Sequence, residues 1–97
     1  MRIIARSTLR EFWETNAEAE PSLRAWIDDA AQADWRSPTD LKNIYANASI
    51  IANNRVIFNI KGNKYRLIVH MRYDIGIVFI RFIGTHAEYD KVDAETI

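Results

Sequence analysis

The pattern of apolar and polar residues divides the chain into two parts with different periods. Up to about residue 45, apolar residues recur three and four positions apart, the spacing that places them on one face of a helix. From Arg55 to Arg72 they largely alternate with polar residues, as in strands that have one buried face, and an almost wholly apolar run follows at 77–83. The sequence therefore predicts helices in its first part and a sheet in its second.

Three helices are expected in the first part, after a short β-branched strand over residues 2–6. Ser7 or Thr8 can cap the first helix, and Pro21 and Pro38 each fall in the first turn of a later one. The three apolar faces are expected to consist of Leu9, Phe12 and Trp13, of Leu23, Trp26, Ile27 and Ala30, and of Leu41, Ile44 and Tyr45. We interpret these faces as core and not as a cofactor-binding surface.

Three strands are expected in the second part, joined by two turns. They cover residues 55–60, 65–72 and 77–83, with turns at 61–64 and 73–76. Arg66 and His70 share one face of the middle strand, and His70 is interpreted as structural. The last strand is apolar apart from Arg81, which is typical of a strand covered on both faces. We therefore expect one α+β domain over residues 1–97, with two to three helices on one face of an antiparallel sheet that ends in a three-strand meander.

Composition narrows the class of protein. Apolar residues make up 48% of the chain and charged residues 27%, the balance of a folded protein. The absence of cysteine excludes disulfides, thiolate metal sites and a cysteine nucleophile, and it permits a reducing compartment. No apolar run has the length of a membrane span or of a signal-peptide core. We expect a cytoplasmic protein that has no membrane partner.

Positive charge is concentrated in the predicted sheet. The formal net charge is zero, which argues against strong binding of free nucleic acid. Residues 55–91, however, hold seven Lys or Arg against three Asp or Glu, whereas residues 1–54 hold six against eight and residues 92–97 none against two. Charge alone leaves two interpretations open, a phosphate-binding surface and an ordinary solvated one.

Residues suited to phosphodiester chemistry lie near the predicted strand ends. The chain has no glycine-rich phosphate loop, no serine elbow and no cluster with metal-ligand spacing, so we expect neither a cofactor nor a metal. Attack by a ribose 2′-hydroxyl on the adjacent phosphate needs a base, an acid and cations. The residues that can supply these groups or bind the RNA are Asn59, Lys61, Asn63, Lys64, Arg66, Arg81, His86, Tyr89 and Lys91.

Each of these residues also has an ordinary structural interpretation. Arg81 can form a buried ion pair with Asp90 or Glu88. His86 and Tyr89, three positions apart, can simply pack together if their segment is helical. The basic residues of the first hairpin can lie in water, and its asparagines can serve the turn. The residues alone do not decide between these alternatives.

Two segments, Phe58–Ile68 and Phe82–Lys91, resemble the signature stretches of the HigB family of toxins in the RelE superfamily. The resemblance covers essentially residues 1–92 and implies the RelE-like fold, which agrees with the α+β arrangement above. It also implies a toxin that cleaves mRNA in the decoding site of the ribosome. The implied partner is a HigA-type antitoxin with a helix-turn-helix domain. The toxin would contact DNA only indirectly, through this antitoxin.

The resemblance implies roles for the candidate residues. Arg66 falls at a phosphate-binding arginine of the superfamily, His86 follows the glycine after the last strand, where relatives have a catalytic basic residue, and Tyr89 lies close to a C-terminal tyrosine. We expect a metal-independent endoribonuclease with His86 as acid or base, Tyr89 as its partner, and Arg66 and Arg81 stabilising phosphate charge. The residues expected to bind RNA are Lys61, Lys64, Asn59, Asn63 and Lys91.

The superfamily relation also keeps a second class open. ParE toxins, which poison gyrase, share the fold without nuclease chemistry, and an inert protein that only docks the antitoxin would look similar. The zero net charge departs from the strongly basic relatives and favours an active site that the ribosome completes.

Overall fold

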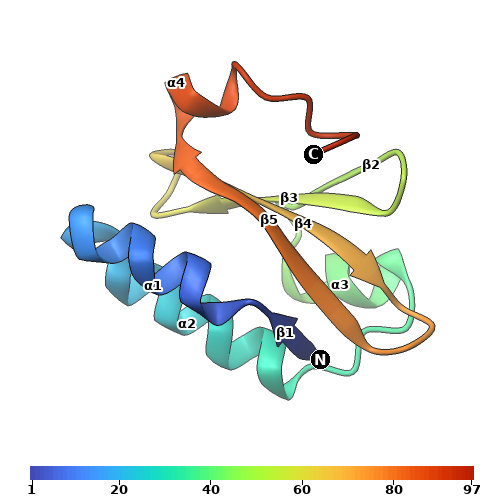
Figure 1. Ribbon diagram of the computed structural model, residues 1–97. Helices are drawn as coiled ribbons and strands as arrows, with labels where there is room; N and C mark the ends of the chain where they lie inside the picture. Colours follow the sequence, from blue (N-terminus) through green and yellow to red (C-terminus); the bar gives the residue numbers. More distant parts are fainter.

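The computed structural model describes all 97 residues, which fold around one five-stranded sheet of order β1-β5-β4-β3-β2 (Figure 1). The strands are β1 (Arg2–Ile4), β2 (Ser49–Ile51), β3 (Arg55–Ile60), β4 (Tyr65–Arg72) and β5 (Ile77–Thr85). Strands β3, β4 and β5 form the predicted antiparallel meander. The α+β class with a short N-terminal strand and a C-terminal meander is confirmed.

The sheet differs from the prediction at its two edges. β1 pairs in parallel with β5, so the sheet is mixed and not wholly antiparallel. Parallel pairing requires a long crossover connection, which the helices between these strands provide. At the other edge β2, in a segment without a clear period, pairs antiparallel with β3 over three residues.

Helices cover one face of the sheet, and the end of the chain crosses the other (Figure 1). The helical elements are α1 (Arg6–Thr15), the 3-10 turn η1 (Ala17–Ala19), α2 (Glu20–Gln32), α3 (Pro38–Ile44) and α4 (His86–Tyr89). In Figure 1, α1 and α2 lie side by side below the sheet, whereas α4 and the segment after it lie above. None of the helices has the length and hydrophobicity that crossing a membrane requires.

The helix starts follow the predicted signals in two of three cases. Pro21 and Pro38 lie in the first turns of α2 and α3, and the Ser37 hydroxyl caps α3 by accepting from the Asp40 N–H at 3.3 Å. The prediction that Ser7 or Thr8 caps α1 is wrong, because α1 begins at Arg6 with no side-chain cap. Pairing of β1 with β5 extends to Ile4, which leaves one residue before the helix starts.

The core fills the space between the sheet and the helices. Trp26 packs edge-on against Phe58 of β3 at 5.4 Å between ring centroids, and Tyr45 also meets Phe58 edge-on, at 5.2 Å. The predicted face of α2 is entirely buried. Ile44, predicted on the buried face of its helix, is 65% exposed because α3 ends there and Tyr45 takes the place against Phe58.

The opposite face of the sheet, called the outer face below, is covered only in part. Ile57 and Ile68 are buried there, yet they do not belong to the core under the helices. α4 and residues 90–97 run back over this face (Figure 1). Because alternate residues of a strand point to opposite faces, the outer face also carries Arg55 of β3 and Arg66 and His70 of β4. Arg55 lies opposite His70, and Arg66 lies opposite Asn59.

Candidate active site

Strand β5 contains a β-bulge at Arg81. Ile68 pairs with Phe82 while Val69 pairs with Ile80, so Arg81 is the extra residue. Arg81 is exposed and forms no ion pair; its Nε donates to the Ile97 main-chain oxygen at 3.2 Å. The expectation of a strand covered on both faces is wrong, because Arg81 is exposed on the outer face. The alternative of a buried ion pair for Arg81 is excluded as well.

The short helix α4 brings His86 and Tyr89 together. The Thr85 hydroxyl accepts from the Glu88 N–H at 3.2 Å, and the Glu88 carboxylate accepts from the Thr85 N–H at 2.9 Å, which completes a capping box. The His86 and Tyr89 rings meet edge-on, with centroids 6.1 Å apart. The prediction that these two residues are neighbours on a helical turn is confirmed.

Arg66 joins this pair from β4. It lies opposite Gly84, its guanidinium is 5.9 Å from the Tyr89 ring centroid, and its Nη1 donates to the Asn63 carbonyl at 3.2 Å. We refer to Arg66, His86 and Tyr89 as the Arg66–His86–Tyr89 group. A guanidinium, an imidazole and a phenol at one end of the outer face are the side chains that phosphoryl chemistry without a cofactor needs.

Gly84, opposite Arg66, is closely covered by an aromatic ring. A Cβ at this position would lie 2.6 Å from the Phe82 ring, which occupies the space above the glycine. Any other residue would displace that ring, next to the strand position that carries Arg66. The glycine is therefore needed for close approach and not for a special backbone angle.

Two carboxylates border the group and differ in their surroundings. Asp90 Oδ1 lies 3.6 Å from His86 Nδ1, and both side chains are more than half exposed. Hydrogen bonds from the Thr85 backbone and hydroxyl lower the pKa of Glu88. Glu88 is therefore ionised near neutral pH and held in the capping box, so it is not a proton donor for chemistry.

The two candidate lysines are paired with a residue that the sequence did not single out. Lys64 and Lys61 both form ion pairs with Glu18 of η1, Lys61 at 3.2 Å, and the Tyr65 hydroxyl donates to the same carboxylate at 2.6 Å. These hydrogen bonds, Lys64 first, lower the pKa of Glu18 to about 2. No local signal connects Glu18 to residues more than 40 positions later in the chain.

The remaining candidates lie around the edges of the group. Asn59 and Asn63 are exposed and line a cavity of about 540 Å³ between the first hairpin and the end of α3. Lys91 is exposed directly after α4. The structure thus gathers Arg66, His86 and Tyr89 in one place and leaves Arg81 apart, against the C-terminal segment.

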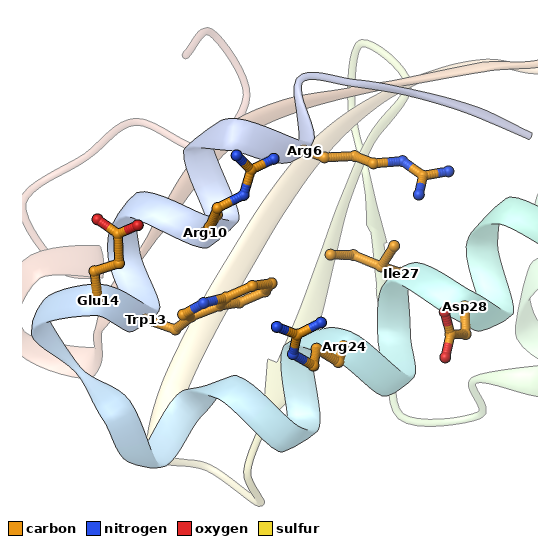
Figure 2. A pocket seen from close by; sticks show the side chains of 7 residues that line it. All are labelled: Arg6, Arg10, Trp13, Glu14, Arg24, Ile27 and Asp28. Atoms are coloured by element: carbon orange, nitrogen blue, oxygen red, sulfur yellow. The ribbon is translucent and has the colours of Figure 1, made fainter.

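A second cavity of about 380 Å³ lies on the helical side of the molecule, between α1 and α2 (Figure 2). Arg6, Arg10 and Arg24 extend around it, and the Arg24 guanidinium lies 4.8 Å from the Trp13 ring centroid while pairing with Glu20. None of the candidate residues lines this cavity. Nowhere in the chain do three or more His, Asp or Glu side chains gather so as to hold a metal ion.

Comparison of the sequence with known proteins identifies a family. The sequence model of the HigB toxin family, described as the RelE-like toxic component of a toxin-antitoxin system, matches residues 19–92. Similar proteins are the mRNA interferase toxin HigB of Escherichia coli (strain K12) and the mRNA interferase HigB of Escherichia coli O157:H7 and of Shigella flexneri. Each is 24% identical over 92 residues, which span 93% of this chain and 88% of the relative.

The family match confirms the resemblance inferred from the two signature segments. It covers most of the chain, including every candidate residue from Asn59 to Lys91. A toxic component of this kind has an antitoxin as its partner. The chain therefore belongs to the HigB toxin family of RelE-like toxins from toxin-antitoxin systems.

Proposed function

We propose that this toxin is a ribosome-dependent mRNA endonuclease that cleaves without a metal and acts in the cytoplasm. The observation that carries the proposal is the Arg66–His86–Tyr89 group at the exposed end of the outer face. The similar proteins named mRNA interferases support the choice of substrate. A HigA-type antitoxin with a helix-turn-helix domain would be its neutralising partner and its only connection to DNA.

In the proposed reaction, a ribose 2′-oxygen attacks the adjacent phosphorus and the bond to the 5′-oxygen breaks. His86 and Tyr89 form the proton-transfer pair: one accepts the proton of the 2′-hydroxyl and the other supplies a proton to the leaving 5′-oxygen. The Arg66 guanidinium offers fixed N–H donors to the negative charge that builds up on the phosphate oxygens. The products are a 2′,3′-cyclic phosphate and a 5′-hydroxyl.

The charge distribution supports the dependence on the ribosome. The chain has no net charge, and two of its candidate RNA-binding cations, Lys61 and Lys64, are shared with the Glu18 carboxylate. Both features weaken the capture of free RNA, whose binding depends on neutralising phosphates. On the ribosome the mRNA is already held in place, so the toxin needs only to position the reacting groups.

Mapping RNA ends after induction of the toxin tests this function. New 5′ ends within translated mRNA are expected with the wild type and with Arg72→Ala, and none with His86→Ala or Arg66→Ala. Arg72 is the matched control because it lies on the same strand and face as Arg66 but pairs with Asp74 at 2.8 Å. Growth arrest with intact mRNA and trapped gyrase–DNA complexes would contradict the proposal.

Metal independence is tested in vitro. Ribosomes crosslinked to survive chelation are programmed with mRNA and exposed to the toxin with and without EDTA. Equal cleavage is expected, because the proposed proton transfers use side chains only. Cleavage that EDTA abolishes and Mg²⁺ restores would contradict this part of the proposal.

A further inference from the structure

Two arginines of the outer face converge on one oxygen of the C-terminal segment. Arg55 donates to the Ile97 main-chain oxygen from Nε at 3.2 Å and from Nη2 at 2.7 Å, and Arg81 donates to it from Nε at 3.2 Å. Neither guanidinium forms an ion pair, whereas nearby Arg72 is neutralised by Asp74. Three N–H groups from two cations are thus directed at a single point.

The surroundings of that point are also positive. His70 lies directly opposite Arg55 in the β3–β4 pairing, and its pKa is lowered by burial and then by the charges of Arg55, Arg81 and Arg72. No carboxylate appears among the groups that influence this imidazole. None of the ion pairs between side chains involves Arg55 or Arg81.

The Ile97 main-chain oxygen does not satisfy all the hydrogen-bond donors of Arg55 and Arg81 equally well. The single Ile97 oxygen accepts from three N–H groups of two guanidinium groups, although an oxygen of this kind has two lone pairs. A phosphate group offers several charged oxygens, which match the forked donors of two guanidinium groups. A phosphate would therefore satisfy more of these donors at once than the one Ile97 oxygen that they share.

We propose that Arg55 and Arg81 form a second phosphate-binding site on the outer face, and that residues 93–97 occupy this site as an internal competitor in the free toxin. That this phosphate belongs to an RNA strand rests on the proposed function. Arg66 and His70 are four residues apart on β4, about 13 Å along the strand. The new site would thus hold a different phosphate of the same RNA from the one at the Arg66–His86–Tyr89 group.

The C-terminal segment is suited to being displaced. Residues 93–97 form a turn closed on itself, in which the Asp93 carbonyl accepts from the N–H groups of Thr96 and Ile97. Apart from the contacts of Ile97, one further hydrogen bond ties it to the rest of the chain, from Asn53 Nδ2 in the turn between β2 and β3 to the Glu95 carbonyl at 3.1 Å. Few hydrogen bonds to the rest of the chain therefore need to break when the segment leaves the outer face.

The first test follows the arginine Nε–H and C-terminal amide resonances of the full chain by NMR. Inorganic phosphate and a 2′-O-methyl RNA oligonucleotide, which cannot be cleaved, are titrated in separately. Both are expected to shift the Nε–H signals of Arg55 and Arg81 and to move the amides of residues 93–97 toward random-coil positions. Shifts confined to Arg66, or none at all, would overturn the proposal.

The second test measures affinity for the same oligonucleotide in variants. A chain ending at Val92 keeps the hydrogen bond from the Val92 N–H to Tyr89 and so leaves α4 closed. If the segment occupies the site about nine-tenths of the time, its removal tightens binding about tenfold. Adding Arg55→Ala to the shortened chain should cancel that gain; a shortened chain that binds no tighter would contradict the proposal.

A milder pair of variants covers the case in which shortening the chain impairs folding. Asn53→Gly removes the hydrogen bond to Glu95, and Asn54→Gly is its matched control, since both asparagines have positive φ angles of 61° and 57° that glycine accepts. Asn53→Gly should tighten binding about two- to tenfold, the range covered by one hydrogen bond, and Asn54→Gly should not. Equal affinities of the two variants would count against the competitor role.

The outcomes separate this inference from the function on which it rests. If phosphate and RNA displace the segment but ribosome-bound mRNA is not cut, the proposed function fails and the phosphate site stands. If mRNA is cut but neither probe moves the segment, only the inference fails. If the antitoxin displaces residues 93–97 but neither inorganic phosphate nor the RNA oligonucleotide does, the outer face binds protein and the inference is wrong.

Discussion

His86 and Arg66 have side chains on which the fold depends little. The His86 side chain is 53% exposed, and Arg66 is half-buried with one hydrogen bond, to the Asn63 carbonyl. We predict that His86→Ala and Arg66→Ala each slow single-turnover cleavage about a hundredfold or more and change the free energy of urea unfolding by less than about 1 kcal/mol. Arg72→Ala is the control for a lost arginine on this face. Normal cleavage by His86→Ala would mean that the active site is misplaced.

Arg81 is expected to act on binding and not on the chemical step. It is exposed, forms no ion pair and lies apart from His86. Arg81→Ala should therefore change unfolding stability by less than about 1 kcal/mol and raise the half-saturating concentration for ribosome-bound mRNA about tenfold at an unchanged maximal rate. A lower maximal rate at unchanged half-saturation would instead assign Arg81 to the scissile phosphate.

Residue-scale prediction from the sequence worked where partners are close along the chain. The pairing of His86 with Tyr89 follows from a separation of three positions on a helical turn. The contacts of Glu18 with Lys61 and of Arg55 with Ile97 join residues 43 and 42 positions apart, so only the fold creates them. The β-bulge at Arg81 was not predictable, because it depends on the register between β4 and β5.

At the scale of elements, the capping box holds α4 and with it the orientation of His86. Glu88→Gln keeps an oxygen that can accept from the Thr85 N–H, whereas Glu88→Ala removes it. We predict that Glu88→Ala destabilises α4 by about 1 kcal/mol and slows cleavage several-fold, while Glu88→Gln retains most of the rate. The comparison uses single-turnover rates and the NMR coupling constants of α4. Equal losses in both variants would point to the Glu88 charge instead.

The contact of η1 with the first hairpin predicts a dependence of stability on pH. The pKa of Glu18 falls from its ordinary 4.5 to about 2 in the folded protein, mainly through Lys64. A lowered carboxyl pKa stabilises the fold above pH 4.5, and that contribution is lost as the pH falls toward 2. In urea titrations across this range, Glu18→Gln should lose less stability than the wild type. Glu14→Gln, an α1 carboxylate without an ion pair, should follow the wild type; a Glu18→Gln curve parallel to the wild type would contradict the assignment.

Helices and strands with a clear hydrophobic periodicity were predictable from the sequence, whereas the pairing of the short edge strands β1 and β2 was not. The long stripe of α2 and the alternation of β4 are repeated over many residues, so the sequence indicates both type and face. β2 has three residues, too few for an alternation to stand out, and β1 joins β5 only because the crossover places it there. The start of α1 differs from its sequence signal for that reason.

At the scale of the whole molecule, the sheet separates two surfaces. One is the helical layer with the cavity between α1 and α2, and the other is the outer face with the Arg66–His86–Tyr89 group and the C-terminal segment (Figures 1 and 2). The class of fold was predictable because helices precede a meander in the sequence. The sequence did not allow us to predict which cations of the outer face lack an ion pair. Ion pairing depends on which carboxylates the fold brings close to each cation.

The most direct test of the central proposal compares cleavage of one mRNA on programmed ribosomes and free in solution. Because the chain has no net charge, we predict single-turnover cleavage about a hundredfold or more faster on the ribosome, and loss of both reactions in His86→Ala. Equal rates on bound and free mRNA would contradict the dependence on the ribosome. Cleavage in neither setting by a folded wild-type protein would contradict the nuclease itself.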